Sequence, residues 1–237
     1  MNYLLFANPY TGSKVLKKLK QFQKPEAVIT SCKNKDNWKT LLLRYITNKL
    51  TVEDRCRFIY KIPFYDYKTL NQNRLKKIID RYNIEIGFIT TFSKIIPREF
   101  AELFPKGLYN IHPSLLPAHA GANPFFWIIY NNEQFSGSTC HLASENLDSG
   151  NIVFQTKYNI KGLNSKDLYK KYCRDCREII QKVLSEYNNL VSIKQNPNDI
   201  AFDPNKIPPQ EHLKKIAKTK YLRKQINKAL KFYNRQI

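Results

Sequence analysis

The chain has 237 residues, of which 42% are hydrophobic, so it can bury a core, and a disordered chain is excluded. Its 40 Lys and Arg residues exceed 19 Asp and Glu residues, so the formal net charge is +21, which favours anionic partners. The basic residues are dispersed rather than grouped, so we interpret them as solvated helix faces and do not expect a nucleic-acid partner. No apolar run approaches the length of a membrane span, so we expect no membrane contact.

Apolar runs alternate with amphipathic segments through the first half of the chain. A short continuous apolar run predicts a strand buried on both faces, and apolar residues three or four apart predict a helix. This alternation predicts a Rossmann-like α/β fold, a mostly parallel sheet with helices on both faces. The predicted strands are residues 3–7, 27–30, 57–64 and 84–90, and the predicted helices are residues 13–21, 36–49, 71–82 and a short one beginning at Pro97.

The second half predicts a strand at residues 108–112, which Pro113 ends. Two strands follow, joined by a loop that contains Asp148. A long amphipathic helix comes next, before a stretch rich in Pro, Asn and Asp that predicts a boundary. We therefore expect a main domain over residues 1–195 and a short basic, helical C-terminal extension over residues 196–237. The two strands are predicted at residues 136–142 and 152–158, the long helix at 165–189, and the basic helices at 211–233.

Five cysteines occur, and the odd number, together with the lack of a signal-peptide pattern, predicts reduced thiols and a cytoplasmic location. Cys173 and Cys176 have the spacing of a metal or redox pair. They fall within a helical pattern and lack a second pair, so we expect no bound metal. The other cysteines are Cys32, Cys56 and Cys140.

Three polar side chains form a candidate active site near the middle of the chain. Asn110 and His112 are two residues apart, so on a strand they point to the same face. Asp148 lies in the turn-like sequence Leu-Asp-Ser-Gly, so we expect it on a loop. An amide, an imidazole and a carboxylate can together polarise a carbonyl and move a proton. Each residue alone is more often structural, so the hypothesis depends on the three together.

Short motifs follow one another around these residues, between positions 107 and 155. Several anchored motifs over about fifty residues are far more specific than one short motif alone. They are Asn110-x-His112, Ser114-Leu115-Leu116-Pro117, Gly121 with Pro124 and Trp127, Gly137-x-Thr139-x-His141, and Asp148-x-Gly150.

With these motifs, the chain resembles the folate-dependent formyltransferase family, whose members use 10-formyltetrahydrofolate. The resemblance implies that residues 1–195 are the catalytic domain and that Asn110, His112 and Asp148 are catalytic. Asn110 and a protonated His112 are expected to donate to the oxyanion that forms at the formyl carbon. Asp148 is expected to favour the charged imidazole, or to accept the proton that the amine loses.

The resemblance also implies a pterin pocket in the loop after the fourth predicted strand. Apolar walls and backbone groups suit a flat, partly polar pterin ring, and Phe92, Ile95 and Ile96 are candidates to bind it. The alternative is that the three residues anchor a short helix to the core. His141 matches the Thr-x-His motif and is expected to brace the loop that carries Asp148.

Two further segments are candidates to bind the substrate. The first loop between a strand and a helix holds substrate phosphate in related enzymes, which points to Thr11, Gly12 and Ser13. A plain tight turn is the alternative reading of that loop. Asn123 and Trp127 belong to the motif region and are expected to contact substrate.

Ala120 stands where many family members have Arg, a departure that weakens the readings as a glycinamide ribonucleotide enzyme or a transfer-RNA enzyme. The sequence Gly-Ala-Asn-Pro at residues 121–124, followed by Trp127 and Asn132-Glu133, resembles amino-sugar N-formyltransferases. We therefore expect formyl transfer to the amine of a nucleotide-linked dideoxy amino sugar of the dTDP-4-amino-4,6-dideoxyglucose type. Such a reaction serves surface polysaccharide (O-antigen) synthesis.

Other functions stay open. One alternative is a glycinamide ribonucleotide formyltransferase of purine synthesis, and another is a non-catalytic protein that binds nucleic acid. A transfer-RNA enzyme is not expected, because residues 196–237 are too few for the β-barrel domain that those enzymes carry. Family members that act on sugars are often dimers, and the C-terminal extension is a candidate to form the interface of a homodimer.

Overall fold

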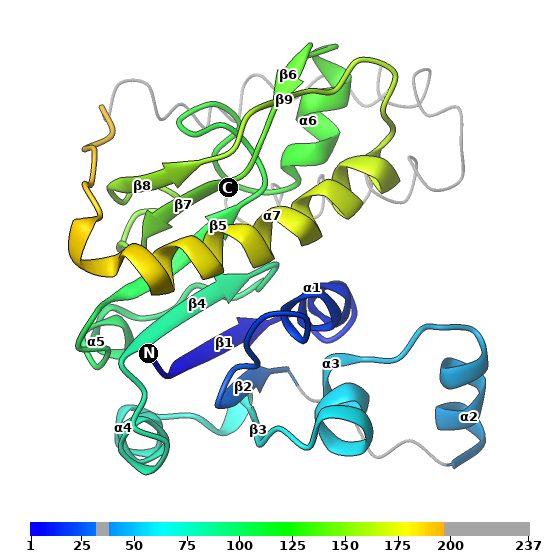
Figure 1. The fold of residues 1–237 in the computed structure, drawn as a ribbon, viewed down its shortest axis with the longest axis vertical. Coiled ribbons are helices and arrows are strands. Elements are labelled where there is room, and N and C mark those ends of the chain that lie inside the picture. Colours follow the sequence, from blue (N-terminus) through cyan, green and yellow to red (C-terminus); the bar gives the residue numbers. More distant parts are fainter. Residues whose placement is uncertain (32–37, 197–237) are drawn as a thin grey trace, which may run out of the picture.

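The computed structural model describes residues 1–31 and 38–196, and it contains one large, mostly parallel sheet (Figure 1). Seven strands lie in the order β3-β2-β1-β4-β5-β7-β8. The first five strands are parallel to one another. At one edge, β7 pairs antiparallel with β5, and β8 pairs antiparallel with β7. The predicted α/β class is therefore confirmed. The strands of this sheet are β1 (Tyr3–Ala7), β2 (Ala27–Thr30), β3 (Phe64–Asp66), β4 (Ile86–Thr90), β5 (Leu108–His112), β7 (Thr139–Leu142) and β8 (Ile152–Gln155).

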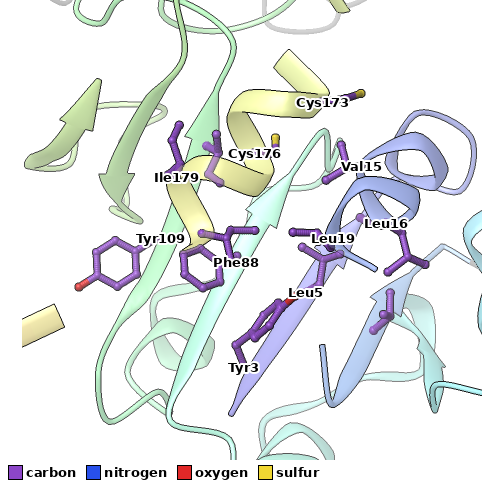
Figure 2. Packing of buried hydrophobic residues seen from close by; sticks show 14 of the residues in the cluster. Tyr3, Leu5, Val15, Leu16, Leu19, Phe88, Tyr109, Cys173, Cys176 and Ile179 are labelled. Carbon is purple, nitrogen blue, oxygen red and sulfur yellow. The ribbon is translucent and has the colours of Figure 1, made fainter. Parts of the chain in front are cut away.

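Helices cover both faces of the sheet, because the side chains of each central strand alternate between two apolar cores. Tyr3 and Leu5 of β1 belong to a core shared with α1, α3 and α7 (Figure 2). Leu4 and Phe6 belong to the core on the other face, with α4 and α5. Burying each such side chain fully contributes about 1.5–3 kcal/mol. The α-helices are α1 (Thr11–Leu19), α2 (Trp38–Ile46), α3 (Val52–Asp54), α4 (Gln72–Arg81), α5 (Arg98–Ala101), α6 (Pro124–Tyr130) and α7 (Ser165–Glu186).

The prediction of a strand at residues 57–64 was wrong, because a helix begins just before it. The Thr51 hydroxyl accepts a hydrogen bond from the Asp54 backbone N–H, and the Asp54 carboxylate accepts one from Thr51 N–H. This capping box starts α3, which continues as a π-helix over Arg55–Tyr60. The strand itself is the short β3. An apolar run of this length fits a strand or a helix equally well, and the capping residues decide between them.

The strands predicted at residues 136–142 and 152–158 are each broken in two. The outer parts form a separate pair, β6 (Phe135–Ser136) with β9 (Tyr158–Asn159). The break lies at Gly137, where an added Cβ would sit 1.7 Å from the Thr156 carbonyl oxygen. The segments around Gly137 and Thr156 therefore cross in close contact, and a side chain at residue 137 would push them apart.

The long predicted helix is confirmed as α7, and the turn Tyr187–Asn189 after it is a 3₁₀ helix. The predicted basic helices at residues 211–233, and nearly all of the extension after residue 195, lie outside the described residues. Within residues 1–31 and 38–196, no helix has both the length and the apolarity that crossing a membrane requires.

The switch from parallel to antiparallel pairing positions the candidate site. The β5–β7 register sets Asn110 opposite His141 and His112 opposite Thr139. The loop between β7 and β8 then returns to the same edge, and it carries Asp148. Polar side chains from β5, β7 and this loop are thereby brought into one place.

Candidate active site

The structure brings the three candidate residues into direct contact. Asn110 and His112 lie on β5, and their side chains face Asp148. The Asn110 Nδ2 atom donates to Asp148 Oδ1 over 2.9 Å, and His112 Nδ1 lies 3.2 Å from Asp148 Oδ2. Asp148 has φ +54°, a left-handed conformation that Asp tolerates better than most residues. The expected clustering of an amide, an imidazole and a carboxylate is therefore present.

The Asp148 carboxylate is buried, with 6% of the residue exposed, and both oxygens have partners. Oδ1 also lies 3.4 Å from His141 Nε2, and Oδ2 accepts the backbone N–H of Gly121 over 2.9 Å. Burial by itself raises the pKa of Asp148, but His112, His141 and the Gly121 N–H outweigh it and bring the pKa down to about 2. The carboxylate is therefore charged at neutral pH and is a weak proton acceptor. A weak proton acceptor whose two oxygens already have partners is more suited to act on the His112 ring than to accept the amine proton directly.

His112 has an acceptor at each ring nitrogen. Nδ1 faces Asp148, and Nε2 lies 2.9 Å from the backbone carbonyl oxygen of His119. The pKa of His112 is nevertheless lowered, because burial disfavours the charged ring more than Asp148 and the His119 carbonyl favour it. Asp148 therefore favours the charged ring, as expected, but burial opposes it more strongly. A proton added to this ring would find acceptors on both sides.

Asn110 directs its amide nitrogen inward. Nδ2 lies 2.9 Å from Asp148 Oδ1 and 3.1 Å from His141 Nε2. His141 Nδ1 lies 2.8 Å from the Leu142 carbonyl oxygen, which can only accept, so Nδ1 donates there. The Asn110 amide nitrogen thus has a contact on each side, and donation to an oxyanion requires one of these contacts to open. The expectation that His141 braces the Asp148 loop agrees with these contacts.

The motif glycines and Thr139 form the backing of this site. A Cβ on Gly150 would lie 1.8 Å from the Leu142 carbonyl oxygen, so only glycine fits two residues after Asp148. The Thr139 hydroxyl donates to the Ser114 carbonyl over 2.7 Å and accepts the Leu116 N–H over 3.0 Å. These contacts tie the loop that follows β5 to the strand that carries His141.

Two backbone groups belong to the site although residue types do not reveal them. They are the N–H of Gly121 and the carbonyl of His119, which contact Asp148 and His112 respectively. The sequence points to this loop only through Gly121, the glycine of the motif. Its φ of +91° is a conformation that glycine adopts most easily.

The candidate pterin residues differ in their surroundings. Ile96 is 9% exposed and packs in the core under α4 and α5, and Phe92 makes edge contacts with the Phe6 and Tyr67 rings at 5.7 and 5.2 Å. Ile95 is 67% exposed, and its carbonyl accepts the Tyr67 hydroxyl. Core packing therefore accounts for Phe92 and Ile96, whereas the Ile95 side chain faces solvent.

The first loop also divides into packing and exposed residues. A Cβ on Gly12 would lie 2.6 Å from the Ala7 Cβ, so Gly12 lets α1 approach β1. The buried Ser13 hydroxyl donates to the Leu50 carbonyl and accepts Arg55 Nε over 2.7 Å. Thr11 is exposed at the first turn of α1. Of the three residues, Thr11 is the one whose side chain is open to a ligand.

Asn123 ends the loop that contains Gly121, and Trp127 lies on α6, the helix that follows this loop. Asn123 caps α6 in a left-handed conformation, with φ +59°. Trp127 is partly buried on α6 and makes edge contacts with Phe126 and Tyr130. Both residues therefore flank the loop whose backbone contacts Asp148.

The cysteines of the described segments are inert by their surroundings. Cys56, Cys140, Cys173 and Cys176 are buried and form no disulfide with one another, and burial raises the pKa of Cys173 to about 11. In residues 1–31 and 38–196, no group of three or more His, Cys, Asp or Glu side chains could hold a metal ion.

Comparisons with known proteins agree with this architecture. The family model for formyl transferases matches residues 1–184. A methionyl-tRNA formyltransferase of Borrelia hermsii is 31% identical over 190 residues, which are 79% of this chain and 59% of that protein. The chain thus spans less than two thirds of the length of this relative.

Two solved structures are similar over most of this chain. An N-formyltransferase from Helicobacter canadensis, in complex with folinic acid and dTDP-3-aminofucose, has TM-score 0.55 and 26% identity, covering 85% of this chain and 70% of that one. Glycinamide ribonucleotide transformylase 1 from Symbiobacterium toebii has TM-score 0.61 and 17% identity, covering 83% and 95%. The second likeness concerns the fold alone.

Proposed function

Because the chain belongs to the formyl transferase family, whose model matches residues 1–184, we propose that it transfers a formyl group from 10-formyltetrahydrofolate to an amine. The observation that carries the proposal is the buried Asp148 carboxylate, which contacts both Asn110 and His112. The folinic acid bound by the similar Helicobacter canadensis enzyme supports a folate as the formyl donor.

The accepting amine that we propose is that of a nucleotide-linked dideoxy amino sugar. The Helicobacter canadensis structure with dTDP-3-aminofucose supports this class of acceptor at 26% identity. The sequence from Gly121 to Pro124, followed by Trp127, supports it independently. The product would carry a formamide on the sugar and would serve the synthesis of a surface polysaccharide.

The residues of the site divide the chemistry between them. The folate supplies the formyl group, and during transfer the amine loses one proton and the folate nitrogen gains one. A neutral His112 can take the amine proton at Nε2 once its contact with the His119 carbonyl opens, and can pass it to the leaving nitrogen. Asp148 then faces a charged ring and stabilises it by about 1–3 kcal/mol, as expected for a hydrogen bond to a charged group.

Asn110 has a separate part in the proposed reaction. Its two amide hydrogens are held toward Asp148 and His141 in the free protein. When His112 becomes charged and draws the Asp148 carboxylate, one amide hydrogen can turn to the oxyanion that forms at the formyl carbon. Losing one such donor costs about 3–4 kcal/mol of barrier in comparable sites.

Methionyl-tRNA is the second candidate acceptor, because the Borrelia hermsii relative at 31% identity carries that name. The net charge of +21 would suit a polyanion. This candidate predicts that formyl transfer weakens steeply as salt rises, whereas transfer to a small nucleotide sugar changes less.

One assay separates the candidates. The full chain is incubated with 10-formyltetrahydrofolate and, in turn, with a panel of nucleotide-linked amino sugars, glycinamide ribonucleotide, or methionyl-tRNA. We expect the mass of one formyl group to be added to a nucleotide sugar, and Asp148→Asn to abolish most of that gain. Formylation of methionyl-tRNA or glycinamide ribonucleotide instead would contradict the sugar assignment. Salt-sensitive RNA binding without any transfer would favour a non-catalytic protein.

A further inference from the structure

A glutamine far along the chain holds the loop that carries Asp148. Gln195 is 6% exposed, and its Nε2 atom donates to the carbonyl oxygens of Asp148 and Gly150, over 2.9 and 2.7 Å. The two N–H groups of one amide thus fix the backbone on both sides of Ser149. They hold the short turn in which Asp148 takes its left-handed conformation.

The segment before Gln195 is anchored to the sheet and aims its amide at this turn. Ile193 and Ile152 exchange backbone hydrogen bonds of 2.7 and 2.8 Å, which adds an isolated antiparallel bridge beside β8. Asn151 and Ser192 make a weaker side-chain contact of 3.5 Å. The position of Gln195 is therefore set by the sheet that also carries the site.

The amide of Gln195 is used only for donation within the described part of the chain. Its Oε1 atom is buried and accepts no hydrogen bond from residues 1–31 or 38–196. Turning the amide over would place Oε1 against the two carbonyl oxygens, so its orientation is fixed by the network. A buried acceptor without a partner opposes folding, and such groups call for an explanation.

We propose that Gln195 is a positioning residue for formyl transfer, which sets the Asp148 carboxylate against His112. This inference rests on the proposed function. The carboxylate has four contacts, to Asn110, His141, His112 and the Gly121 N–H, and the backbone of Asp148 must be fixed for all four to form. Since proton transfer and oxyanion contacts are sensitive to displacements below 1 Å, loss of the Gln195 contacts should reduce turnover.

The test replaces the amide by a side chain of similar length that cannot donate. Gln195→Met should lower kcat about 10- to 100-fold, and the rate constant for formyl transfer in single-turnover assays should fall by the same factor. KM for either substrate, measured at steady state, should change less than about threefold. Ser192→Ala is the matched control, because it removes a 3.5 Å contact from the same segment and leaves both carbonyl contacts in place. We expect this control to keep wild-type kcat.

A double-mutant cycle tests whether Gln195 acts through Asp148. Adding Gln195→Met to Asp148→Asn should cause no further loss of kcat, because the charge to be positioned is already gone. As a readout without turnover, ¹³C NMR titration should give a higher Asp148 pKa in Gln195→Met than in the wild type. Should Gln195→Met fail to fold, Gln195→Asn, which keeps the amide but draws it back by one methylene, takes its place with a smaller expected loss.

The outcomes separate this inference from the proposed function. If Asp148→Asn loses activity while folded Gln195→Met and Gln195→Asn keep wild-type kcat, the role of Gln195 is wrong and the proposed function stands. An equal loss on the wild-type and Asp148→Asn backgrounds would also overturn it. If Asp148→Asn keeps wild-type turnover, the catalytic assignment fails, and the role of Gln195 fails with it.

Discussion

The β5–β7 edge and the loop between β1 and α1 both contain residues that the sequence marks for ligands, but their side chains point in different directions. At the β5–β7 edge, polar atoms of Asn110 and His112 converge on the buried Asp148 carboxylate. In the first loop, the Ser13 hydroxyl points into the protein, and Gly12 makes room for Ala7. We therefore propose a catalytic role for the polar residues around the buried charge, whereas Gly12 and Ser13 pack against backbone and core.

The largest effect is expected from Asp148→Asn, which removes the charge on which the β5–β7 edge converges. We expect kcat to fall about 100- to 1000-fold, because a protonated His112 loses its counter-ion and the network of four contacts is altered. Single-turnover formyl transfer measures this loss. Asp167→Asn, on an exposed part of α7, is the matched control and should keep wild-type kcat.

Glycine substitutions compare the same two regions by their steric demands. Gly150→Ala, two residues after Asp148 in the sequence, would place a methyl group 1.8 Å from the Leu142 carbonyl oxygen. We expect the unfolding free energy to fall by about 3 kcal/mol or more and activity to be lost with it. Gly12→Ala should cost about 1–3 kcal/mol while the folded fraction keeps kcat. Urea unfolding and active-site titration separate the two losses. Equal retention of activity in both variants would show that the Asp148 loop needs no close packing.

The pH dependence of the unfolding free energy should also differ between wild type and Asp148→Asn. The pKa of Asp148 is about 2 in the folded protein, below the ordinary value of 3.8, so the folded state favours the carboxylate. Its contribution of about 2 kcal/mol is present above the unfolded pKa and is lost as pH falls from about 5 to 2. The lowered pKa of His112 acts in the same direction, since the unfolded ring takes up a proton first.

The urea midpoint, measured at several pH values, should fall less steeply for Asp148→Asn than for the wild type across this acidic range. Equal pH dependence of the two proteins would show that Asp148 is not stabilised as a carboxylate. The difference between the proteins reports the Asp148 charge together with its effect on His112, because the carboxylate also favours the charged form of that ring.

The smallest effects concern the first loop. Ser13→Ala should lower stability by about 1–3 kcal/mol, because the buried Arg55 guanidinium loses an acceptor, and should change KM for the nucleotide sugar less than about twofold. Thr11→Ala should leave stability unchanged and raise KM a few-fold if this loop binds phosphate. Steady-state kinetics with urea unfolding tests both. A rise in KM for Ser13→Ala alone would restore the phosphate role of Ser13.

Much of the fold followed from local patterns in the sequence. The runs of β1 and β2 have the apolar composition of strands buried on both faces, and Pro113 ends β5. Each of the three was predicted at the bounds that the structure has. The helix over Arg55–Tyr60 was missed because Phe58 and Ile59 suit a strand, and the Thr51 cap that decides the matter lies earlier. The Gly137 crossing was missed because it depends on Thr156, nineteen residues away.

The candidate site was predictable where side chains carry the signal. Asn110, His112 and Asp148 are recognisable by type and spacing, and His141 by its motif. The His119 carbonyl and the Gln195 amide were not, because a backbone group has no residue type and a single glutamine has no pattern. The balance between burial and Asp148 that sets the pKa of His112 also depends on packing, which only the three-dimensional structure supplies.

The most direct measurement compares wild type and His112→Ala in one single-turnover reaction with 10-formyltetrahydrofolate and a dTDP-linked amino sugar. If His112 passes the proton between the amine and the leaving nitrogen, the wild type forms the formamide and His112→Ala forms it about 100- to 1000-fold more slowly. Equal rates from two folded proteins would contradict the account.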